Sequence, residues 1–118
     1  MKPIRGRVAR LSALVLGLGL LGFGNSALAA GSAGAGRDKA HKCEACHGLD
    51  GRSKIAEAPN LAGQIENYLI SQLRAFKAGE RKSELMSIVA PTLSAQDIED
   101  LAAYYSAIEV TVGKVPAN

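Results

Sequence analysis

The sequence predicts an all-α protein of three or four short helices. Apolar residues recur at helical spacings of three and four in two separate segments, and glycine, proline and serine punctuate the chain between them. Neither the alternation of a half-buried strand nor a strand–helix–strand pattern is found in the sequence. These observations favour helices packed on one another over any fold built on a sheet.

The first 29 residues have the three regions of a secretory signal peptide. Residues 1–10 contain four basic residues and no acid, residues 11–24 are apolar and uncharged, and small residues lead to cleavage after Ala29 or, alternatively, Ala30. A retained membrane anchor would need about 20 apolar residues, whereas this run has 14 and contains four glycines. We therefore expect residues 1–29 to be removed, leaving a periplasmic chain that does not span a membrane.

Loss of this leader would reverse the net charge. The whole chain carries 14 basic and 11 acidic residues and a net charge of +3; the leader holds four of the basic residues, so ten remain against 11 acids, a net charge of −1. The excess positive charge belongs to the leader. A nucleic-acid-binding protein is therefore excluded, because its basic footprint is missing from the remaining chain.

Residues 30–118 can form one domain with a thin core. They contain four aromatic residues and two cysteines. Domains of this size usually need a disulfide, a metal or another cofactor to stabilise them. Cys43 and Cys46 are three residues apart, so a disulfide between them would constrain little of the chain. We expect the stabilising group to be something that these cysteines hold.

The N-terminal part of this domain is expected to start as a flexible segment. Residues 30–36 are rich in glycine, alanine and serine and predict a flexible N-terminal stretch, with the main domain over residues 37–110. Residues 38–45 contain good helix formers and predict a short first helix. Residues 48–60 contain glycine, proline and asparagine and predict a loop.

A longer helix is expected over residues 65–78, with Gly79 as its C-terminal cap. Its buried face is predicted to consist of Ile65, Leu69, Leu73 and Phe76. Residues 80–84 are wholly polar and predict an exposed stretch, and residues 85–90 predict a short helix stopped by Pro91.

The last helix is expected over residues 95–109, with Ser94 as its N-cap and Asp97 in its first turn. Its buried stripe is predicted to consist of Ile98, Leu101, Tyr105 and Ile108. Residues 109–112 favour a strand but have no partner strand, so residues 111–118 are expected to form a tail.

The two cysteines lie in the segment Cys43-Glu44-Ala45-Cys46-His47, which is the C-x-x-C-H pattern of c-type haem attachment. Residues three apart lie on the same face of a helical turn, so both thiols can form thioethers with the vinyl groups on one edge of a porphyrin. The next residue, His47, is then carried under the ring, where its Nε2 can bind iron. The sequence therefore predicts one covalently bound haem c per chain.

Three other uses of these cysteines fit less well. A structural zinc site needs about four ligands, often as two separated pairs. Here all the candidate ligands, His41 and those of the motif, lie within seven residues, with no second pair. A thioredoxin-like C-x-x-C motif needs a βαβ context, which the sequence does not predict. A plain disulfide would explain neither His47 nor the thin core.

Met86 is the strongest candidate for the second axial ligand. It is the only methionine after residues 1–29 and lies 39 residues beyond His47, far enough for the chain to wrap around a haem. His41 lies too close to the motif to reach the opposite face, and lysines are usually solvated. A lone methionine is otherwise usually core filler, and an open sixth position is the alternative. His/Met ligation raises the redox potential, which favours electron transfer over oxygen activation.

These residues resemble class I bacterial cytochromes c, especially the small monohaem group similar to cytochromes c4, c5 and c553. The similarity covers nearly all of residues 34–109. It is carried by the haem motif with Gly48 and Gly51, and by Pro59-Asn60-Leu61-Ala62-Gly63-Gln64, Tyr68, Gln72-Leu73, Phe76, Gly79, Arg81, Met86, Leu93-Ser94, Asp97-Ile98, Leu101-Ala102 and Tyr104-Tyr105. The resemblance implies the class I cytochrome c fold, in which short helices wrap around one haem.

The resemblance also implies roles for further residues. Pro59 matches the proline whose carbonyl accepts the Nδ1–H of the ligating imidazole, and Leu61 matches a leucine packed on the haem. Gln64, Tyr68 and Arg81 are candidates for the haem pocket or for binding the haem propionates.

The first and last helices of such proteins are expected to cross, with Tyr104 or Tyr105 near the contact. Many relatives place an aromatic residue of the first helix at this crossing, but this chain has none between Gly34 and Cys43. Small residues must then allow a close approach, and the candidates are Ala35, Gly36 and Ala40.

We therefore expect a periplasmic protein that carries single electrons between redox partners and is not an enzyme, because His/Met ligation leaves no position for a substrate. Encounters between such partners are small and weak. A basic rim for docking could consist of Lys39, Lys42, Arg52, Lys54, Lys77, Arg81 and Lys82. The alternatives are a haem subunit of a periplasmic dehydrogenase or oxidase complex, and a five-coordinate gas-binding or peroxidatic haem protein.

Overall fold

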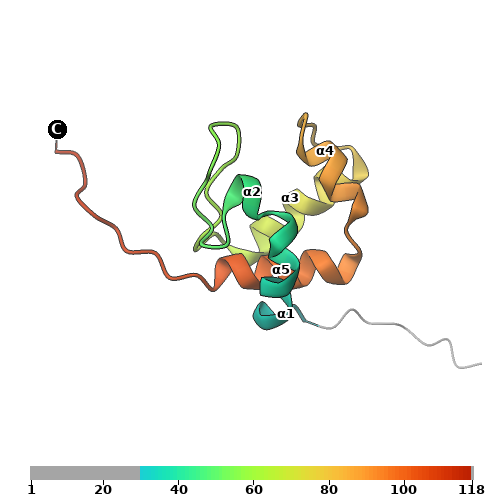
Figure 1. Cartoon of the computed structure of the whole chain (residues 1–118), viewed down its shortest axis with the longest axis horizontal. Helices are drawn as coiled ribbons and strands as arrows, with labels where there is room; N and C mark the ends of the chain where they lie inside the picture. The colour runs from blue at the N-terminus through green and yellow to red at the C-terminus, as the bar shows by residue number, and fades with distance from the viewer. Residues whose placement is uncertain (1–29, 118) are drawn as a thin grey trace, which may run out of the picture.

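The computed structural model describes residues 30–117, and the predicted signal peptide lies outside them. The helical elements in chain order are α1 (Ala33–Lys39), the 3-10 turn η1 (Ala40–Lys42), α2 (Glu44–His47), α3 (Glu66–Ala78), α4 (Met86–Val89), the 3-10 turn η2 (Ala90–Thr92) and α5 (Ala95–Ser106). Residues 30–117 contain no strand, which confirms the all-α prediction. In Figure 1, α2 and α4 lie on either side above α5, and α1 crosses α5 from below.

Helix α3 closely matches its expected span. Gly79 ends it in the left-handed region at φ 75°, where its N–H donates to the carbonyls of Ala75 and Phe76. Leu69 and Phe76 are buried, as predicted. The prediction that Ile65 is buried with them is wrong: Ile65 is the extended N-cap residue, outside the helical periodicity, and its side chain is 70% exposed.

Helix α5 begins where the sequence predicts and ends three residues early. The Ser94 hydroxyl accepts the Asp97 N–H at 3.0 Å, and the Asp97 carboxylate accepts the Ser94 N–H at 2.9 Å, which completes a capping box. The helix ends at Ser106, and the carbonyl of Tyr105 in its last turn accepts the N–H of Gly63 at 2.9 Å, from the loop before α3. Ile98, Leu101 and Tyr105 are buried along its inner face, and Ile108 is half-buried beyond its end.

Helix α1 starts at Ala33, so the expectation of a flexible segment over residues 30–36 is wrong for most of that segment. Ser32 caps the helix by accepting the Ala35 N–H at 3.3 Å, and its own N–H donates to the Asp100 carboxylate at 2.8 Å. Gly36 is buried so closely against α5 that a Cβ on it would lie 1.9 Å from the Asp100 carbonyl oxygen and 2.6 Å from Tyr104 Cβ. The expected close approach through small residues is confirmed at this crossing.

Charged side chains reinforce the contacts that α5 makes with α1 and α3. Lys39 Nζ of α1 lies 2.6 Å from the Asp100 carboxylate and 2.8 Å from that of Asp97. Arg74 of α3 pairs with Glu99 of α5 at 2.5 Å. Asp100 is buried with only 5% of its side chain exposed, so its charge depends on these partners.

The protein-only core is thin, as expected. Its fully buried members are small or medium in size, and Ile98 is the largest side chain that is almost wholly enclosed. The core cluster consists of Ala40, Leu69, Leu93, Ile98, Leu101, Ala102 and Tyr105. These residues lie where α1, α3 and α5 meet. The core cluster therefore does not fill the space between α2 and α4.

Beyond α5 the chain runs outward as an exposed tail without regular structure up to residue 117 (Figure 1). The strand-forming tendency of residues 109–112 is not realised, since the described chain offers no strand to pair with. Within residues 30–117, no helix combines the length and the apolar character needed to cross a membrane.

Candidate haem site

The single turn of α2 holds Cys46 and His47, with Cys43 as its N-cap residue. The turn is closed by the His47 N–H, which donates to the Cys43 carbonyl at 2.9 Å. His47 is buried, and both cysteines are half-buried free thiols. The motif therefore presents two unpaired thiols and one imidazole together, as its spacing predicts.

The imidazole of His47 is oriented from behind by the following loop. Its Nδ1 lies 2.9 Å from the carbonyl oxygen of Pro59. A carbonyl can only accept, so Nδ1 carries a proton, and in the neutral tautomer with that proton the free lone pair is on Nε2. This is the geometry expected of an imidazole that binds a metal through Nε2.

Two tyrosines of α5 hold the backbone that follows His47. Tyr105 donates its hydroxyl to the Gly48 carbonyl at 3.1 Å, and Tyr104 donates to the Leu49 carbonyl at 2.7 Å. Burial raises the pKa of the Tyr105 hydroxyl, so it stays a protonated donor. Burial also raises the pKa of the Cys43 thiol, while nearby Lys42 acts in the opposite direction.

Cys43, Cys46 and His47 form one wall of a cavity of about 670 Å³ whose lining is mainly apolar. Met86, the first residue of α4, also lines this cavity. In Figure 1, α4 lies across from α2, with α3 between them and α5 below. The apolar lining includes Ala58, Pro59, Leu61, Leu69, Leu73, Phe76, Leu85, Val89, Leu93, Leu101, Ala102 and Tyr105. This volume falls within the range of pockets that hold cofactors, and the donor set fits a covalently attached haem.

Polar side chains contribute a second part of the lining. Arg81 donates from Nη1 to Oε1 of Gln72 at 2.5 Å, and its guanidinium carbon lies 4.6 Å from the centre of the Phe76 ring. The polar members of the lining are Lys42, Glu57, Tyr68, Gln72, Arg81, Lys82, Ser83 and Glu84. A bound group with anionic substituents could place those substituents against the cationic side chains of the lining, Lys42, Arg81 and Lys82.

Most of the sequence-predicted pocket residues meet at this cavity. Pro59, Leu61, Tyr68 and Arg81 join the motif and Met86 in its lining. Gln64 does not line the cavity; its side-chain carbonyl accepts the N–H of Ile65 at 2.8 Å, just before α3. Gln72 was not among the predicted site residues, although its place four residues after Tyr68 puts both on one face of α3.

The alternative of a zinc site gains no support from the geometry. His41 Nδ1 is 3.0 Å from the carboxylate of Glu44 at an exposed position. Across residues 30–117, no group of three or more histidine, cysteine, aspartate or glutamate side chains is arranged to hold a metal ion. The cysteines and His47 therefore converge on the cavity and not on a four-ligand metal cluster.

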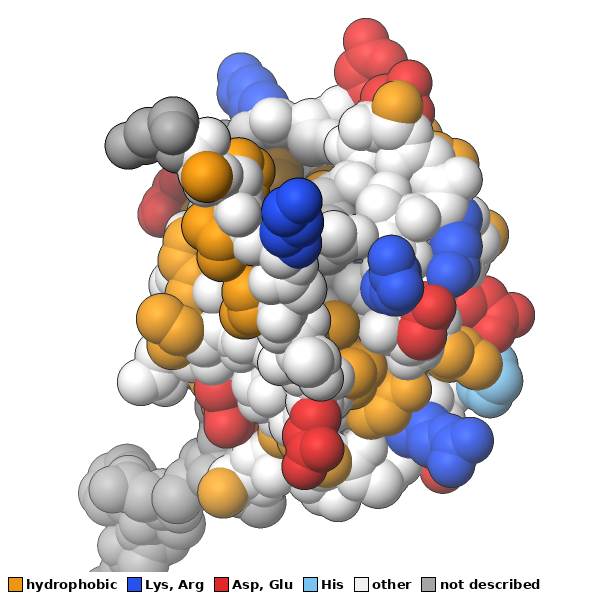
Figure 2. Space-filling model, turned by 90° about the vertical axis from the view of Figure 1, so that its left-hand side faces the viewer, with side chains coloured by type: hydrophobic (Ala, Val, Ile, Leu, Met, Phe, Trp, Pro, Cys, Tyr) orange, Lys and Arg blue, Asp and Glu red, His pale blue; other side chains and the backbone are white. Residues whose placement is uncertain are grey.

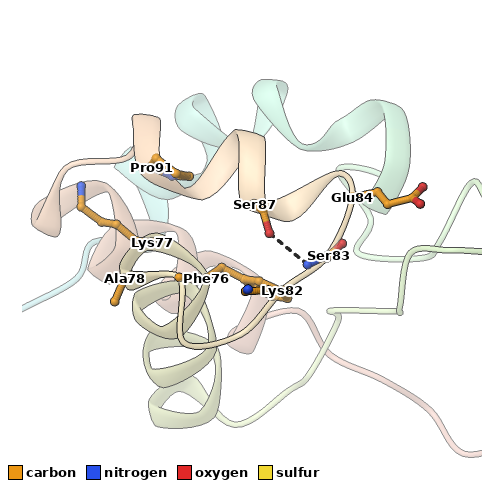
Figure 3. A pocket seen from close by; sticks show the side chains of 9 residues that line it. Phe76, Lys77, Ala78, Lys82, Ser83, Glu84, Ser87 and Pro91 are labelled. Atoms are coloured by element: carbon orange, nitrogen blue, oxygen red, sulfur yellow. Dashed lines mark hydrogen bonds between the residues drawn. The ribbon is translucent and has the colours of Figure 1, made fainter.

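A second hollow lies behind the segment that leads to Met86, and Figure 3 shows it. It has a volume of about 580 Å³ and is open, and it is lined by Phe76, Lys77, Ala78, Gly79, Lys82, Ser83, Glu84, Ser87 and Pro91. It contains neither cysteine nor histidine. We therefore assign the cofactor to the more enclosed cavity beside the motif.

The family described as cytochrome c matches residues 33–107, which is most of the chain. The chain belongs to the cytochrome c family. Members of this family bind haem c covalently, and the fit of the cavity agrees with that chemistry. The predicted class I cytochrome c fold and the resemblance to the cytochrome c4 group are both confirmed by the relatives described next.

Curated relatives include cytochromes c4. The chain is 44% identical over 108 residues to cytochrome c4 of Pseudomonas aeruginosa, a match that covers 92% of this chain and 52% of the relative. It thus spans about half the length of that protein. By contrast, cytochrome c-554(548) of Halomonas halodenitrificans is 48% identical and is covered completely by 68% of this chain.

Solved structures agree with the sequence comparison. Reduced cytochrome c4 from Pseudomonas stutzeri has 45% sequence identity and a TM-score of 0.65, over 71% of this chain and 49% of that one. Thiosulfate dehydrogenase (TsdBA) from Marichromatium purpuratum has 38% identity and a TM-score of 0.61, over 65% of this chain and 19% of that one. The protein is therefore a class I c-type cytochrome of the c4 group.

Proposed function

We propose that this cytochrome c is an exported carrier of single electrons, with one haem c attached at Cys43 and Cys46 and ligated by His47 and Met86. The observation that supports this proposal is the arrangement of these four side chains around one cavity. The thiols and the imidazole come from α2, and the thioether comes from α4 on the other side.

The two axial residues would be held differently by the protein. The hydrogen bond from His47 Nδ1 to the Pro59 carbonyl at 2.9 Å commits one ring nitrogen to the backbone and leaves Nε2 for iron. Met86 offers only a thioether, a soft and neutral ligand that favours ferrous iron. When bound, the haem would accept one electron from a reduced donor and give one electron to an oxidised acceptor.

The proposal of one haem per chain rests on the cysteine count. The whole sequence has two cysteines, both in the motif, so a second covalent haem has no attachment site. With both axial positions occupied by protein, no coordination site is left for a substrate. We therefore propose a carrier and not an enzyme.

The polar part of the cavity lining would serve the haem propionates. Arg81 is already held against Gln72 and the Phe76 ring, so its guanidinium is positioned before any anion binds. Tyr68 and Lys42 belong to the same lining. These three donors are the residues that we propose for the propionates, whereas Gln64 is engaged with its own neighbour.

Docking to redox partners should be weak and transient. Four members of the predicted basic rim are already engaged: Lys39 and Lys54 in ion pairs, Lys77 with the Leu93 carbonyl, and Arg81 with the Gln72 side chain. Figure 2 shows acidic and basic side chains interspersed on one face, not gathered by sign. Strong electrostatic steering is therefore not expected, and contact should depend on the immediate surroundings of the haem.

We further propose that residues 1–29 direct export and that the mature protein works in the periplasm. The support is the three-region leader, which lies outside the described residues. The N-terminal sequence of the purified protein tests the cleavage site after Ala29.

The first experiment is a visible spectrum of the protein exported from a host with haem-attachment machinery. We expect a covalent c-type spectrum in the reduced form and a weak far-red sulfur-to-iron band in the oxidised form. The band should vanish in Met86→Ala, and reduced wild-type protein should bind carbon monoxide only slowly. Absence of covalent haem would refute the whole proposal, and the thiols and His47 would need another function.

Carbon monoxide separates the carrier from the five-coordinate alternative. A c-type spectrum without the far-red band, together with rapid carbon monoxide binding, would keep the haem but reject Met86 as its ligand. The matched control is Met86→Leu, which fills a similar volume without a sulfur atom. It should lose the band while retaining the covalent haem.

A haem subunit of a dehydrogenase complex is the second candidate. A specific observation favours it: the protein named thiosulfate dehydrogenase electron acceptor from Thiomonas intermedia is 44% identical over 72 residues, or 60% of this chain. Affinity purification of the tagged protein from its native host tests this candidate. A stoichiometric dehydrogenase in the eluate would support the complex, and elution of the cytochrome alone at low salt would support the free carrier.

A further inference from the structure

The segment that carries Met86 has little regular structure of its own. Helix α4 is a single turn of four residues, and the preceding residues 80–85 belong to no helix. One turn is too short to be stable by itself. Leu85, its N-cap residue, makes no capping bond through its side chain, so other contacts must fix Met86 against the cavity.

Two serines on either side of Met86 supply such contacts. The Ser83 hydroxyl oxygen accepts the Met86 N–H at 3.3 Å. The Ser87 hydroxyl oxygen accepts the Ser83 N–H at 2.9 Å, the bond drawn in Figure 3. The Ser87 N–H in turn donates to the Ser83 carbonyl at 3.1 Å. Three hydrogen bonds therefore join Ser83 to the two residues at the start of α4.

We propose that Ser83 and Ser87 are positioning residues that hold the Met86 thioether in place on the haem iron. The proposal rests on Met86 being the axial ligand. The bonds fix the backbone from which the Met86 side chain enters the cavity, and a loosened backbone would let the sulfur leave the iron more often. In this proposal neither serine is an iron ligand: Ser87 lines only the open hollow behind α4, and the Ser83 hydroxyl oxygen accepts the Met86 N–H.

The surroundings favour a positioning role over simple solvation. Ser83 is half-buried and lines both the cavity and the open hollow. It therefore lies in the wall between the cofactor space and solvent. Glu84 and Lys82 beside it are exposed, and no ion pair from either of them is found among residues 30–117 that could anchor this stretch.

The test is the rate at which the reduced holoprotein binds carbon monoxide, because binding requires the methionine to leave first. A capping hydroxyl contributes about 1 kcal/mol, or roughly a fivefold change in an equilibrium. Ser83→Ala should therefore bind carbon monoxide about fivefold faster than wild type. Ser87→Ala retains the bond to the Met86 N–H and should give a smaller increase, roughly twofold.

Two further variants make the result specific. Ser83→Thr keeps the hydroxyl and should restore a rate near that of wild type. Ser106→Ala removes a comparable hydroxyl, which donates to the Ala103 carbonyl at 3.1 Å at the far end of α5 (Figure 1). It should leave the carbon monoxide rate and the far-red band unchanged.

The outcomes distinguish this inference from the ligand assignment. If Met86→Ala binds carbon monoxide rapidly while Ser83→Ala and Ser87→Ala bind it at the wild-type rate, the positioning role is refuted and the ligand stands. If wild type already binds as fast as Met86→Ala, both proposals fail. An equal acceleration in Ser106→Ala would show general loosening of the fold and would also refute the positioning role.

Discussion

The hydroxyl of Tyr105 donates to the carbonyl oxygen of Gly48 at 3.1 Å, joining α5 to the residue directly after the candidate iron ligand His47. Its neighbour Tyr104 makes the corresponding bond to Leu49 at 2.7 Å. Adjacent residues of one helix therefore hold two successive carbonyls of the haem-binding segment. Tyr105 is buried and Tyr104 only half-buried. Loss of the Tyr105 bond should therefore lower the free energy of unfolding more than loss of the Tyr104 bond.

Tyr105→Phe should lower the free energy of unfolding by about 1–1.5 kcal/mol, because the buried Gly48 carbonyl loses one hydrogen bond and keeps only the one from the Gly51 N–H at 3.2 Å. Tyr104→Phe is the matched control and should lower it by less than about 1 kcal/mol, since water can replace its hydroxyl. Denaturant titration of the holoproteins measures both. Equal losses in the two variants would contradict the difference in burial on which the prediction depends.

Gly36→Ala should destabilise the crossing of α1 and α5 by about 3 kcal/mol, because the new Cβ would overlap the Asp100 carbonyl and force the helices apart. Gly34→Ala on the same helix is the control: its nearest neighbour would be Ser32 Oγ at 3.8 Å. It should be neutral or stabilising by up to about 1 kcal/mol, since alanine favours helix. Thermal unfolding of the two variants measures this difference in stability. If Gly36→Ala is as stable as Gly34→Ala, the helices can separate without a loss of stability and the prediction is wrong.

Acid should weaken the same crossing. Hydrogen bonds from Lys39 hold the pKa values of Asp97 and Asp100 below their usual range, and backbone N–H groups of Ser94 and Ser32 act in the same direction. Groups with lowered folded-state pKa values stabilise the fold above the unfolded-state pKa of about 4, and this stabilisation is lost as the pH falls through the folded values. The free energy of unfolding should therefore decrease steadily below about pH 5.

Asp100→Asn should remove part of this pH dependence and should lower stability at pH 7. Asp38→Asn removes the same charge from an exposed position of α1 and serves as the control for net charge. Urea titrations between pH 3 and pH 7 measure the slope for each protein. A slope in Asp100→Asn equal to that of wild type would show that the buried carboxylate does not govern the acid response.

Without haem the chain should lose most of its helical structure. Without the haem, the mainly apolar lining of the cavity of about 670 Å³ would be exposed to water, and the protein-only core is too thin to compensate for that loss. The double variant Cys43→Ser with Cys46→Ser prevents attachment. Far-ultraviolet circular dichroism should show a much weaker helical signal than that of the holoprotein, and a native-like signal would contradict the cavity argument.

Helices α3 and α5 could be predicted because their signals are local. Gly79 and Ser94 mark their ends, and the stripes that contain Leu69 and Leu101 follow the helical period. Helix α1 could not be predicted from its own residues, since Gly34 and Gly36 are poor helix formers. Its start depends on the bond from the Ser32 N–H to Asp100, 68 residues away, and no local pattern records such a contact.

The residues of the haem site also divide into those that a sequence pattern predicts and those that depend on distant contacts. Cys43, Cys46 and His47 follow from one short motif, and Met86 follows from its being the only methionine of residues 30–118. Gln72 was missed because its position against Arg81 depends on how the segment after Gly79 folds back onto α3. The roles of Tyr104 and Tyr105 as donors to the loop are equally invisible in sequence, where a tyrosine predicts only a buried ring.

The contact between α1 and α5 also has a consequence for the order in which we expect the chain to fold. Ser32 and Lys39 meet Asp100 across 68 and 61 residues of chain, so these contacts form late and are slow to close. Before Asp100 has docked, we expect the tyrosines of α5 not to be fixed against Gly48 and Leu49. Long-range contacts of the fold would thereby leave its short cysteine motif accessible until folding is nearly complete.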